Sequence, residues 1–388
     1  MRKKFLPFTL PDITKKEISA VSKVLKSGWL TTGLVTQKFE KNFAKFIGVK
    51  YAVAVNSGTA ALHLALDAIG LKSGEEVIVP TLTFTATAEV VTYFGAKPVF
   101  VDCKEDTFNI DPKKIEEKIT KKTKAIIPVH IGGQACDMDE ILKLAKKYNL
   151  KIIEDAAHAL PSEYKGKMIG TISDITCFSF YPTKPITTGE GGMVTTNNKN
   201  WAERIEIMRL HGISHEAWNR YSKGGSWYYQ VLYPGWKYNP TDVASALGIE
   251  QLKRCDLFYR KRKEIAQIYT EAFRSLKEIQ TPYTEPFNQH AWHLYIIKLN
   301  LDRLTISRDR FIEEMRKRNI GISVHFIPLH LQPAYKKYGY KVNDFLVANK
   351  VFQKIVSLPI YSKMTEQDVK DAISVVKDIV KKYRKKRC

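Results

Sequence analysis

A single lysine, Lys184, lies between a stretch rich in aromatic and hydroxyl side chains and a glycine-rich turn, in the segment FSFYPTKPITTGEGGMV over residues 178–194. Apolar runs typical of strands flank this segment. Pro185 disfavours helical geometry at Lys184, so the lysine side chain projects from a loop. The glycines of GEGG permit tight backbone turns beside it. A lysine in such a loop is either a solvated residue or a nucleophile, and the residues upstream decide between the two.

Ser57, Gly58 and Thr59 lie in NSGTAAL, between an expected strand and an expected helix. Free backbone N–H groups and a hydroxyl at the start of a helix can hold a phosphate. The alternative is an ordinary serine or threonine helix cap. The segment lacks the lysine of a P-loop and the glycine spacing of a dinucleotide fingerprint, so it indicates neither ATP nor NAD.

Three further side chains lie at the ends of expected strands, where the ligands of a parallel sheet bind. Phe84 in VPTLTFTATA can either stack on a flat heterocycle or belong to the core. Asp155 follows Glu154 at the end of KIIED, and it can pair with a protonated pyridine nitrogen or cap a helix. Ser179 precedes Lys184 on the next expected strand.

These features are weak evidence one by one, but their order along the chain favours the nucleophile. They predict a pyridoxal 5'-phosphate site in which Lys184 holds the cofactor as a Schiff base and moves protons, while Asp155 keeps the ring nitrogen protonated. The predicted phosphate contacts are Ser57, Gly58, Thr59 and Ser179.

The elements that must position these residues alternate between strand and helix over residues 50–200. Short apolar runs such as KYAVAV and EEVIVP alternate with helical segments such as GTAALHLALDAIGL. This alternation predicts an α/β domain with a mostly parallel sheet. After residue 240 longer helices dominate, joined by the expected strands HLYIIKL and GISVHF. We expect a large domain over residues 1–240, including the N-terminal segment, and a smaller α+β domain over residues 241–388.

Composition narrows the class of protein. The 388 residues carry a formal net charge of +22, with lysines spread along the whole chain and one dense block, KKYRKKRC, at its end. This charge predicts a solvated basic surface that attracts anionic substrates, with nucleic-acid binding as the alternative. The five cysteines are single and odd in number, which predicts reduced thiols. The sequence has neither a membrane-length apolar run nor a secretory apolar segment, so we expect a cytoplasmic protein without a membrane partner.

At this point the chain resembles the DegT-type nucleotide-sugar aminotransferases, a family with the aspartate aminotransferase fold (fold type I) that works as homodimers. The resemblance runs nearly end to end. It is carried by LKSGWLTTG, FEKNFAKFIGVKYAVAVNSGTAALHLAL, VIVPTLTFTATA, PVHIGGQACDMDEI, IIEDAAHA, FSFYPTKPITTGEGGMV, GWKYNPTDVASALGIEQL, AWHLYIIKL and GISVHFIPLH.

The resemblance implies the same roles for Lys184, Asp155 and the phosphate contacts. It also implies that Phe84 stacks on the cofactor ring and that His158 lies near the phenolic oxygen of the cofactor. In GWKYN the family supplies a residue to the cofactor phosphate of the neighbouring subunit. Many members read G-x-N-x-R there, so either Lys237 or Asn239 makes that contact here.

The same resemblance bears on the substrates. SGWLTTG is similar to members that aminate C4 of a keto sugar, and GWKYN with HAWHLYIIKL to the 4-amino-4-deoxyarabinose branch. We therefore expect a UDP-linked 4-keto sugar as acceptor and L-glutamate as amino donor. The candidate substrate residues are Trp29, Thr31, Thr32, His325 and His330. For the two histidines the alternative is a packed or solvated imidazole, and their spacing does not support a metal site.

Other activities remain open at this stage. Amination at C3 and pyridoxamine-dependent sugar dehydration both occur among relatives, and dehydrating relatives carry histidine where this chain has Lys184. A cofactor-binding regulator without turnover and a nucleic-acid binder are the non-enzymatic alternatives.

Overall fold

The computed structural model describes residues 2–214 and 228–385. The last three residues of the basic block KKYRKKRC, including Cys388, therefore lie outside the described residues. Within the described chain, no helix is both long enough and apolar enough to cross a membrane.

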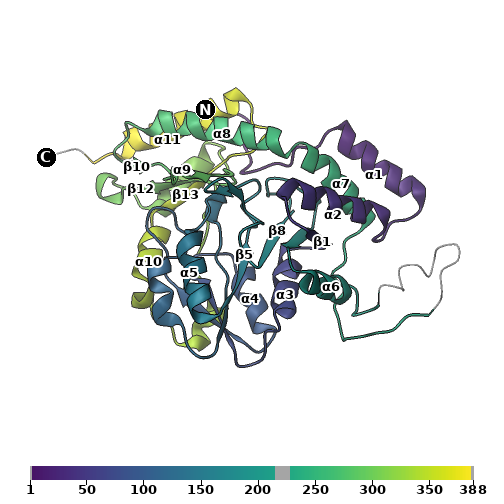
Figure 1. Ribbon diagram of the computed structural model, residues 1–388. Helices are drawn as coiled ribbons and strands as arrows, with labels where there is room; N and C mark the ends of the chain where they lie inside the picture. Colours follow the sequence, from purple (N-terminus) through teal and green to yellow (C-terminus); the bar gives the residue numbers. More distant parts are fainter. Residues whose placement is uncertain (1, 215–227, 386–388) are drawn as a thin grey trace.

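A seven-stranded mixed sheet forms the centre of the large domain (Figure 1). Four neighbouring pairs are parallel, and β9 is antiparallel to both of its neighbours. The predicted mostly parallel sheet is thus confirmed. In spatial order the strands are β1 (Tyr51–Val55), β9 (Gly192–Thr196), β8 (Ile175–Ser179), β5 (Lys151–Asp155), β4 (Thr123–Ile126), β2 (Glu76–Pro80) and β3 (Lys97–Val101).

Helices cover both faces of this sheet. Alternation of side chains along a strand sends Val77 and Val79 of β2 into one core cluster and Ile78 into the other. The first cluster includes apolar side chains of α3 (Gly58–Ala68), α4 (Ala86–Thr92), α6 (Lys199–Met208) and α10 (Leu346–Phe352). The second includes those of α2 (Leu34–Ile47), α5 (Met138–Tyr148) and α7 (Asp242–Lys253).

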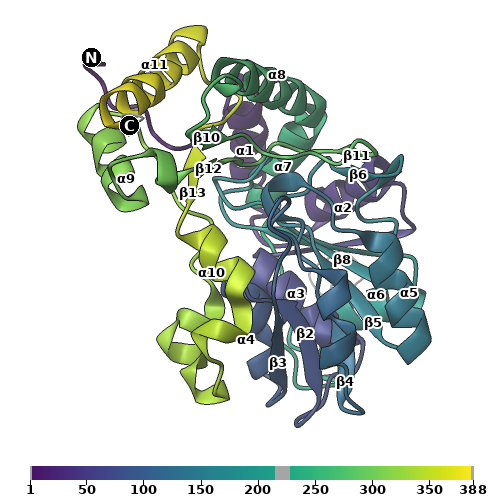
Figure 2. The ribbon, with the colours of Figure 1, turned by 90° about the vertical axis from the view of Figure 1, so that its left-hand side faces the viewer.

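The smaller C-terminal unit has its own core around a three-stranded antiparallel sheet (Figure 2). Its strands are β10 (Ile279–Gln280), β12 (Tyr295–Leu299) and β13 (Ile355–Leu358), and its helices are α8 (Cys255–Phe273), α9 (Arg308–Lys317) and α11 (Glu366–Tyr383). The predicted strand GISVHF is wrong: within it only Ser323 pairs with a strand, through an isolated bridge to Ser357.

Short elements connect these layers. A second three-stranded sheet consists of β6 (Glu163–Tyr164), β7 (Lys167–Met168) and β11 (Asn288–Gln289). The short 3-10 helices are η1 (Pro112–Lys114), η2 (Glu116–Lys118), η3 (Ile131–Gly133), η5 (Leu301–Arg303), η6 (Leu329–Leu331), η7 (Pro333–Tyr338) and η8 (Val342–Phe345).

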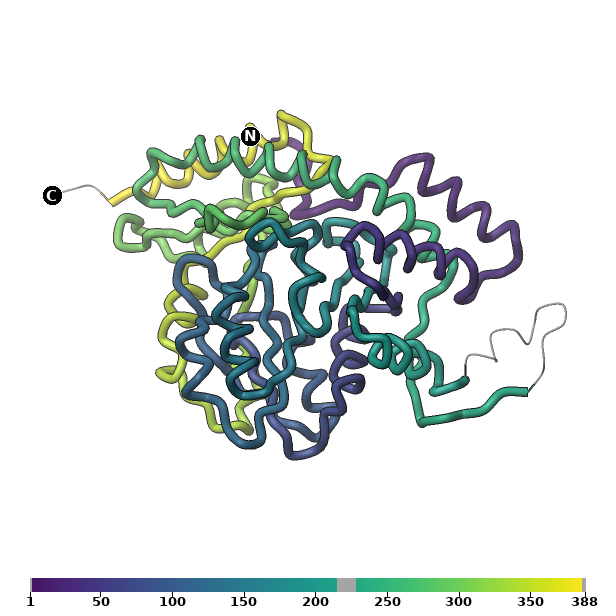
Figure 3. Tube along the Cα trace, in the orientation of Figure 1, coloured from purple at the N-terminus to yellow at the C-terminus, as the bar shows by residue number. Residues whose placement is uncertain are grey.

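The N-terminal segment packs against both units (Figure 3). Leu6 forms a parallel bridge with Ile320 and belongs to the core of the smaller unit. Helices α1 (Lys15–Ser27) and α2 both contact α7. The division at residue 240 stays a prediction. Helices α7 and α10 follow this residue, and both contribute to core clusters of the large sheet.

A buried ion pair anchors two helices to the edge strand β1. Arg209, just after α6, donates to Glu40 of α2 and to the carbonyl of Ala54 at 2.6 Å, and Glu40 accepts from the N–H of Ala54 at 2.9 Å. The side chains of Arg209 and Glu40 are only 3% and 13% exposed. Both charges are therefore largely desolvated and depend on each other.

We expect Arg209→Met to lower the free energy of unfolding by about 3 kcal/mol, because it leaves the Glu40 carboxylate without its counter-charge. Chemical denaturation monitored by circular dichroism measures the loss. The matched surface variant, Lys253→Met, breaks the exposed pair with Glu250 and is expected to cost at most about 1 kcal/mol. Equal losses in the two variants would contradict this account, and adding Glu40→Gln to Arg209→Met is expected to recover part of the loss.

Candidate active site

A cavity of about 510 Å³ opens at the carboxyl ends of β5 and β8. The structure brings nine of the predicted residues together there. They are Ser57, Gly58, Thr59, Phe84, Asp155, His158, Ser179, Lys184 and His325. The sheet achieves this because the carboxyl ends of parallel strands meet at one edge.

Lys184 reaches the cavity from a tight turn after β8, in which its N–H donates to the carbonyl of Tyr181 at 2.9 Å. Burial lowers the pKa of Lys184 to about 8, against a smaller opposing effect of the Asp155 carboxylate. A lysine amine with this pKa is partly neutral near neutral pH and so can act as a nucleophile or base. Lys184 is partly buried and lines the cavity, which favours the nucleophile over a freely solvated residue, and its role stays a prediction.

Asp155 and Glu154 have different surroundings because neighbouring strand residues face opposite sides of the sheet. Glu154 is fully buried and bonded to His130 at 2.9 Å, Ser173 at 2.7 Å and Thr176 at 2.8 Å, so it is a structural carboxylate. Asp155 instead lines the cavity.

Each oxygen of the Asp155 carboxylate accepts one internal hydrogen bond. Thr87 Oγ1 donates at 2.8 Å and the N–H of Ala157 at 3.1 Å. Burial raises the pKa of Asp155, whereas these two donors and the positive charge of Lys184 oppose that rise. A buried carboxylate of this kind gains from a cationic partner in the cavity, and a pyridinium nitrogen supplies one. No helix begins at Asp155, so the cap alternative fails.

The predicted phosphate cradle is the N-terminus of α3. Ser57 is its N-cap, and its Oγ accepts from the N–H of Ala60 at 3.0 Å, so the cap alternative is correct for this hydroxyl. The cap does not exclude a phosphate at the same end of the helix. Gly58 is the first residue of the helix, and a Cβ added there would lie 2.8 Å from Cβ of Ser179. Only glycine gives the first turn this close approach to β8.

Phe84 is 58% exposed and lines the cavity, so the core alternative for this ring is wrong. The ring of Phe326 lies nearby, with the two ring centroids 6.0 Å apart and the planes tilted. The exposed ring is therefore available to a flat ligand, as the predicted stacking role requires.

His158 is buried and its Nδ1 accepts from the N–H of Gly132 at 3.2 Å. This bond places the ring proton of the neutral imidazole on Nε2. Burial, with the positive charge of Lys184 and two other histidines, lowers the pKa of His158 well below its ordinary value. His158 thus presents a neutral N–H donor, which suits a contact with a phenolic oxygen.

The other two predicted histidines differ from each other. His325 lines the cavity, and its Nδ1 is bonded to the hydroxyl of Ser357 at 2.8 Å. His330 lies outside the cavity lining, with Nδ1 bonded to Thr81 at 2.7 Å and Nε2 to Asn349 at 3.1 Å. The packed-imidazole alternative therefore describes His330, and we leave it out of the substrate residues.

The remaining predicted residues form a separate network beside the cavity. Lys237 Nζ donates to Oδ1 of Asn239 at 2.6 Å, and Nδ2 of Asn239 donates to the hydroxyl of Thr32 at 2.7 Å. Trp29 Nε1 donates to the carbonyl of Thr32 at 3.2 Å, and the side chains of Trp29 and Thr31 are exposed. None of these five residues is among the described lining of the cavity, so their roles toward ligands stay predictions.

Sequence reasoning missed three residues of the site. Thr87 holds Asp155, Phe326 neighbours Phe84, and His293 lines the cavity from the smaller unit. The quoted segments VPTLTFTATA and HAWHLYIIKL contain Thr87 and His293. Their types carry no chemical signal until the fold places them, because a threonine in a helix and a histidine before a strand are common packing residues.

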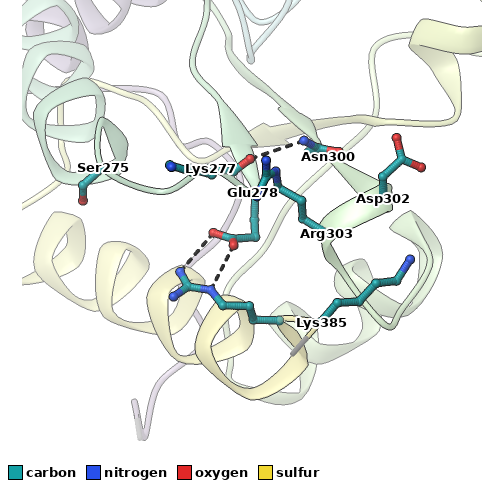
Figure 4. Close-up of a pocket in the computed structure, with 8 residues that line it drawn as sticks. Ser275, Lys277, Glu278, Asn300, Asp302, Arg303 and Lys385 are labelled. Carbon is teal, nitrogen blue, oxygen red and sulfur yellow. Dashed lines mark hydrogen bonds and ion pairs between the residues drawn. The ribbon is translucent and has the colours of Figure 1, made fainter. Parts of the chain in front are cut away.

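A second hollow lies in the smaller unit and is lined by charged side chains (Figure 4). Its buried carboxylate, Glu278, is neutralised by Arg384 through two bonds of 2.9 and 3.0 Å. It contains none of the predicted site residues. The chemistry therefore belongs to the cavity around Lys184.

Comparison with known proteins agrees with this geometry. Residues 11–377 match the DegT/DnrJ/EryC1/StrS aminotransferase family. The chain belongs to this family. It is therefore an enzyme, its cofactor is pyridoxal 5'-phosphate, and the predicted fold class is confirmed.

Three proteins illustrate the similarity. An uncharacterized protein of Methanocaldococcus jannaschii is 54% identical, with 99% of this chain and 100% of that protein covered. The spore coat polysaccharide biosynthesis protein SpsC of Bacillus subtilis is 50% identical, with 98% of each covered. The solved PLP-form of the putative sugar aminotransferase Spr1654 of Streptococcus pneumoniae is 35% identical, with 97% of this chain and 99% of that chain covered and a TM-score of 0.90.

The residues of the cavity fit this cofactor on structural grounds. The N-terminus of α3, where Gly58 lies against Ser179, can receive a phosphate, and Asp155 keeps acceptor capacity for a pyridinium proton. Phe84 offers an exposed ring, and Lys184 a partly neutral amine.

We expect Gly58→Ala to raise the dissociation constant for pyridoxal phosphate by about tenfold, since its Cβ forces the helix start and Ser179 apart. Equilibrium titration of the apoenzyme measures this constant. Ser179→Gly removes the clashing Cβ, so Gly58→Ala is expected to add much less in that background. An undiminished effect in the double variant would mean that the clash is not the cause.

The pKa of Lys184 predicts how the rate of cofactor attachment depends on pH. Only the neutral amine attacks, so the rate with pyridoxal phosphate is expected to rise with pH through about 8 and then level off. Stopped-flow absorption measures it. Asp155→Asn removes the negative charge that raises the pKa of Lys184 and is expected to move the midpoint to lower pH. A midpoint at the ordinary lysine value would contradict the effect of burial.

Proposed function

We propose that this enzyme transfers the amino group of L-glutamate to C4 of a nucleotide-linked 4-keto sugar, with UDP as the expected nucleotide. The observation that carries the transamination is the placement of Lys184 beside Asp155 in a cavity built from a phosphate cradle and an exposed aromatic ring. The names of SpsC, a spore coat polysaccharide biosynthesis protein, and of Spr1654, a putative sugar aminotransferase, support a sugar as acceptor. The segment SGWLTTG supports C4.

Bound pyridoxal phosphate supplies the electron sink that makes the Cα proton of the donor acidic and carries the amino group between the two substrates. Lys184 is the group that removes and returns this proton, because its lowered pKa lets it act as a base and then as an acid. Asp155 would hold a proton on the ring nitrogen by its negative charge. His158 would donate a hydrogen bond from its Nε2–H to the phenolic oxygen.

We further propose a homodimer in which Lys237 or Asn239 reaches the cofactor phosphate of the partner subunit. Lys237, Asn239 and Thr32 form one hydrogen-bonded network, so the loop containing Trp29 and the loop containing Asn239 are positioned together. This coupling supports a site in which substrate and cofactor contacts come from the same surface. His325 and residues Trp29, Thr31 and Thr32 are the proposed sugar contacts.

The buried thiols and the positive net charge support a cytoplasmic enzyme with an anionic substrate. Cys103, Cys136, Cys177 and Cys255 are buried free thiols, which favours a reducing, cytoplasmic location. The net charge of +22 favours an acceptor that carries a diphosphate. We propose neither a nucleic-acid partner nor a membrane partner.

A C3 aminotransferase and a pyridoxamine-dependent sugar dehydratase are the alternatives within the same family. Lys184 disfavours the dehydratase, since relatives that dehydrate carry histidine at this position. The expectation of C4 over C3 depends on the segment SGWLTTG.

The test begins with the absorption spectrum of the protein and of Lys184→Ala, each with pyridoxal phosphate. We expect a visible band of the protonated Schiff base in the native protein alone, and its loss on addition of glutamate. UDP-linked 4-keto and 3-keto sugars are then added, and NMR of the products locates the new amine. We expect amination at C4.

Each other result selects a different function. A visible band that glutamate leaves unchanged would point to a regulator without turnover or to another amino donor. Amination of the 3-keto sugar alone would establish the C3 alternative, and loss of the sugar hydroxyl without amination the dehydratase.

A further inference from the structure

His293 is a cavity residue to which neither the sequence nor the family assigned a role above. It is 4% exposed and reaches the cavity from the segment just before β12. Its Nδ1 is buried and has no hydrogen-bond partner within the described part of the chain. We therefore take Nε2 as the ring nitrogen that meets a ligand in the cavity.

Backbone hydrogen bonds hold the segment that carries His293. The neighbouring N–H groups of Ala291 and Leu294 donate to the carbonyls of Gly133 and Gly132 at 3.0 and 3.1 Å. The carbonyl of His293 accepts from the buried guanidinium of Arg262 at 3.3 Å. These bonds attach the segment to the loop that also orients His158.

Two cationic side chains, Lys184 and Arg262, act on His293. Its ring lies 4.4 Å from that of His158, and burial together with His158, Lys184, Arg262 and His325 lowers its pKa well below the ordinary value. His293 is therefore neutral in the free enzyme. Burial and these two cations oppose a charge on the imidazole, and the same two cations favour an anion beside it.

An anion must be received in this cavity if glutamate is the amino donor. Glutamate brings two carboxylates, and a buried carboxylate needs charged or polar donors. Among the described lining residues, Lys184 is the single lysine or arginine, and the cofactor occupies it. Neutral imidazoles and hydroxyl groups are the other side-chain donors of the lining.

We propose that His293 binds a carboxylate of the dicarboxylic amino donor through its Nε2 hydrogen. This inference rests on the proposed use of glutamate. It makes His293 a specificity residue of the first half-reaction and gives it no contact with the keto sugar. The carboxylate then offsets the cationic groups around the ring.

The test compares two variants of the cofactor-loaded enzyme. His293→Phe keeps the ring and removes its nitrogen donors, whereas His293→Gln places an amide near the position of Nε2. We expect His293→Phe to raise the KM for glutamate and the dissociation constant of glutarate, an unreactive dicarboxylate, by about tenfold or more. We expect His293→Gln to recover most of this loss, with the cofactor spectrum and the KM for the sugar unchanged in both.

Several results would overturn the proposal. Unchanged glutarate binding in His293→Phe would mean that other groups receive the carboxylate. Good binding in His293→Phe and poor binding in His293→Gln would indicate a packing ring, as would loss of the cofactor in both variants. Failure of the native enzyme itself to react with glutamate would instead overturn the proposed amino donor, and glutarate binding would still report on His293.

Discussion

The burial of one pair of titratable side chains, Lys184 and Asp155, dominates the electrostatics of the cavity. Lys184 and Asp155 line the same cavity. Burial lowers the pKa of Lys184 and raises the pKa of Asp155, so it favours the neutral form of each side chain. Their mutual attraction and the donors on Asp155 oppose that shift. Thr87 in α4, the N–H of Ala157 after β5 and the turn after β8 all maintain this balance. The sheet keeps these groups together, because they lie near the carboxyl ends of its strands.

The electrostatic arrangement extends to neutral groups. His158, His293 and His325 are all kept uncharged beside Lys184, so the cavity contains few fixed charges. Adding a proton to any one of these rings would raise the energy of a protonated Lys184. Neutral imidazoles can still donate hydrogen bonds, and they do so without competing with the lysine for protons.

Much of this site was predictable because its residues follow strands. Strand periodicity located β1, β2 and β5, and the rule that ligands bind at strand ends then selected Ser57, Phe84 and Asp155. His293 was not predictable in this way, since it comes from a different unit and becomes a neighbour of His158 only through tertiary packing. His330 shows the opposite error, because its type suggested chemistry while Thr81 and Asn349 occupy both ring nitrogens. The strand expected at GISVHF failed because hydrophobic alternation does not reveal whether a pairing partner is free.

The bridge between Leu6 and Ile320 joins parts of the chain that are far apart in sequence. The core of the smaller unit contains Leu6 together with side chains of α11. Forming this core therefore closes a very long loop, which costs conformational entropy before the contacts are made. The strands of the large sheet all lie within residues 51–196 and pair over shorter separations. We therefore expect the smaller unit to complete its core more slowly than the large sheet.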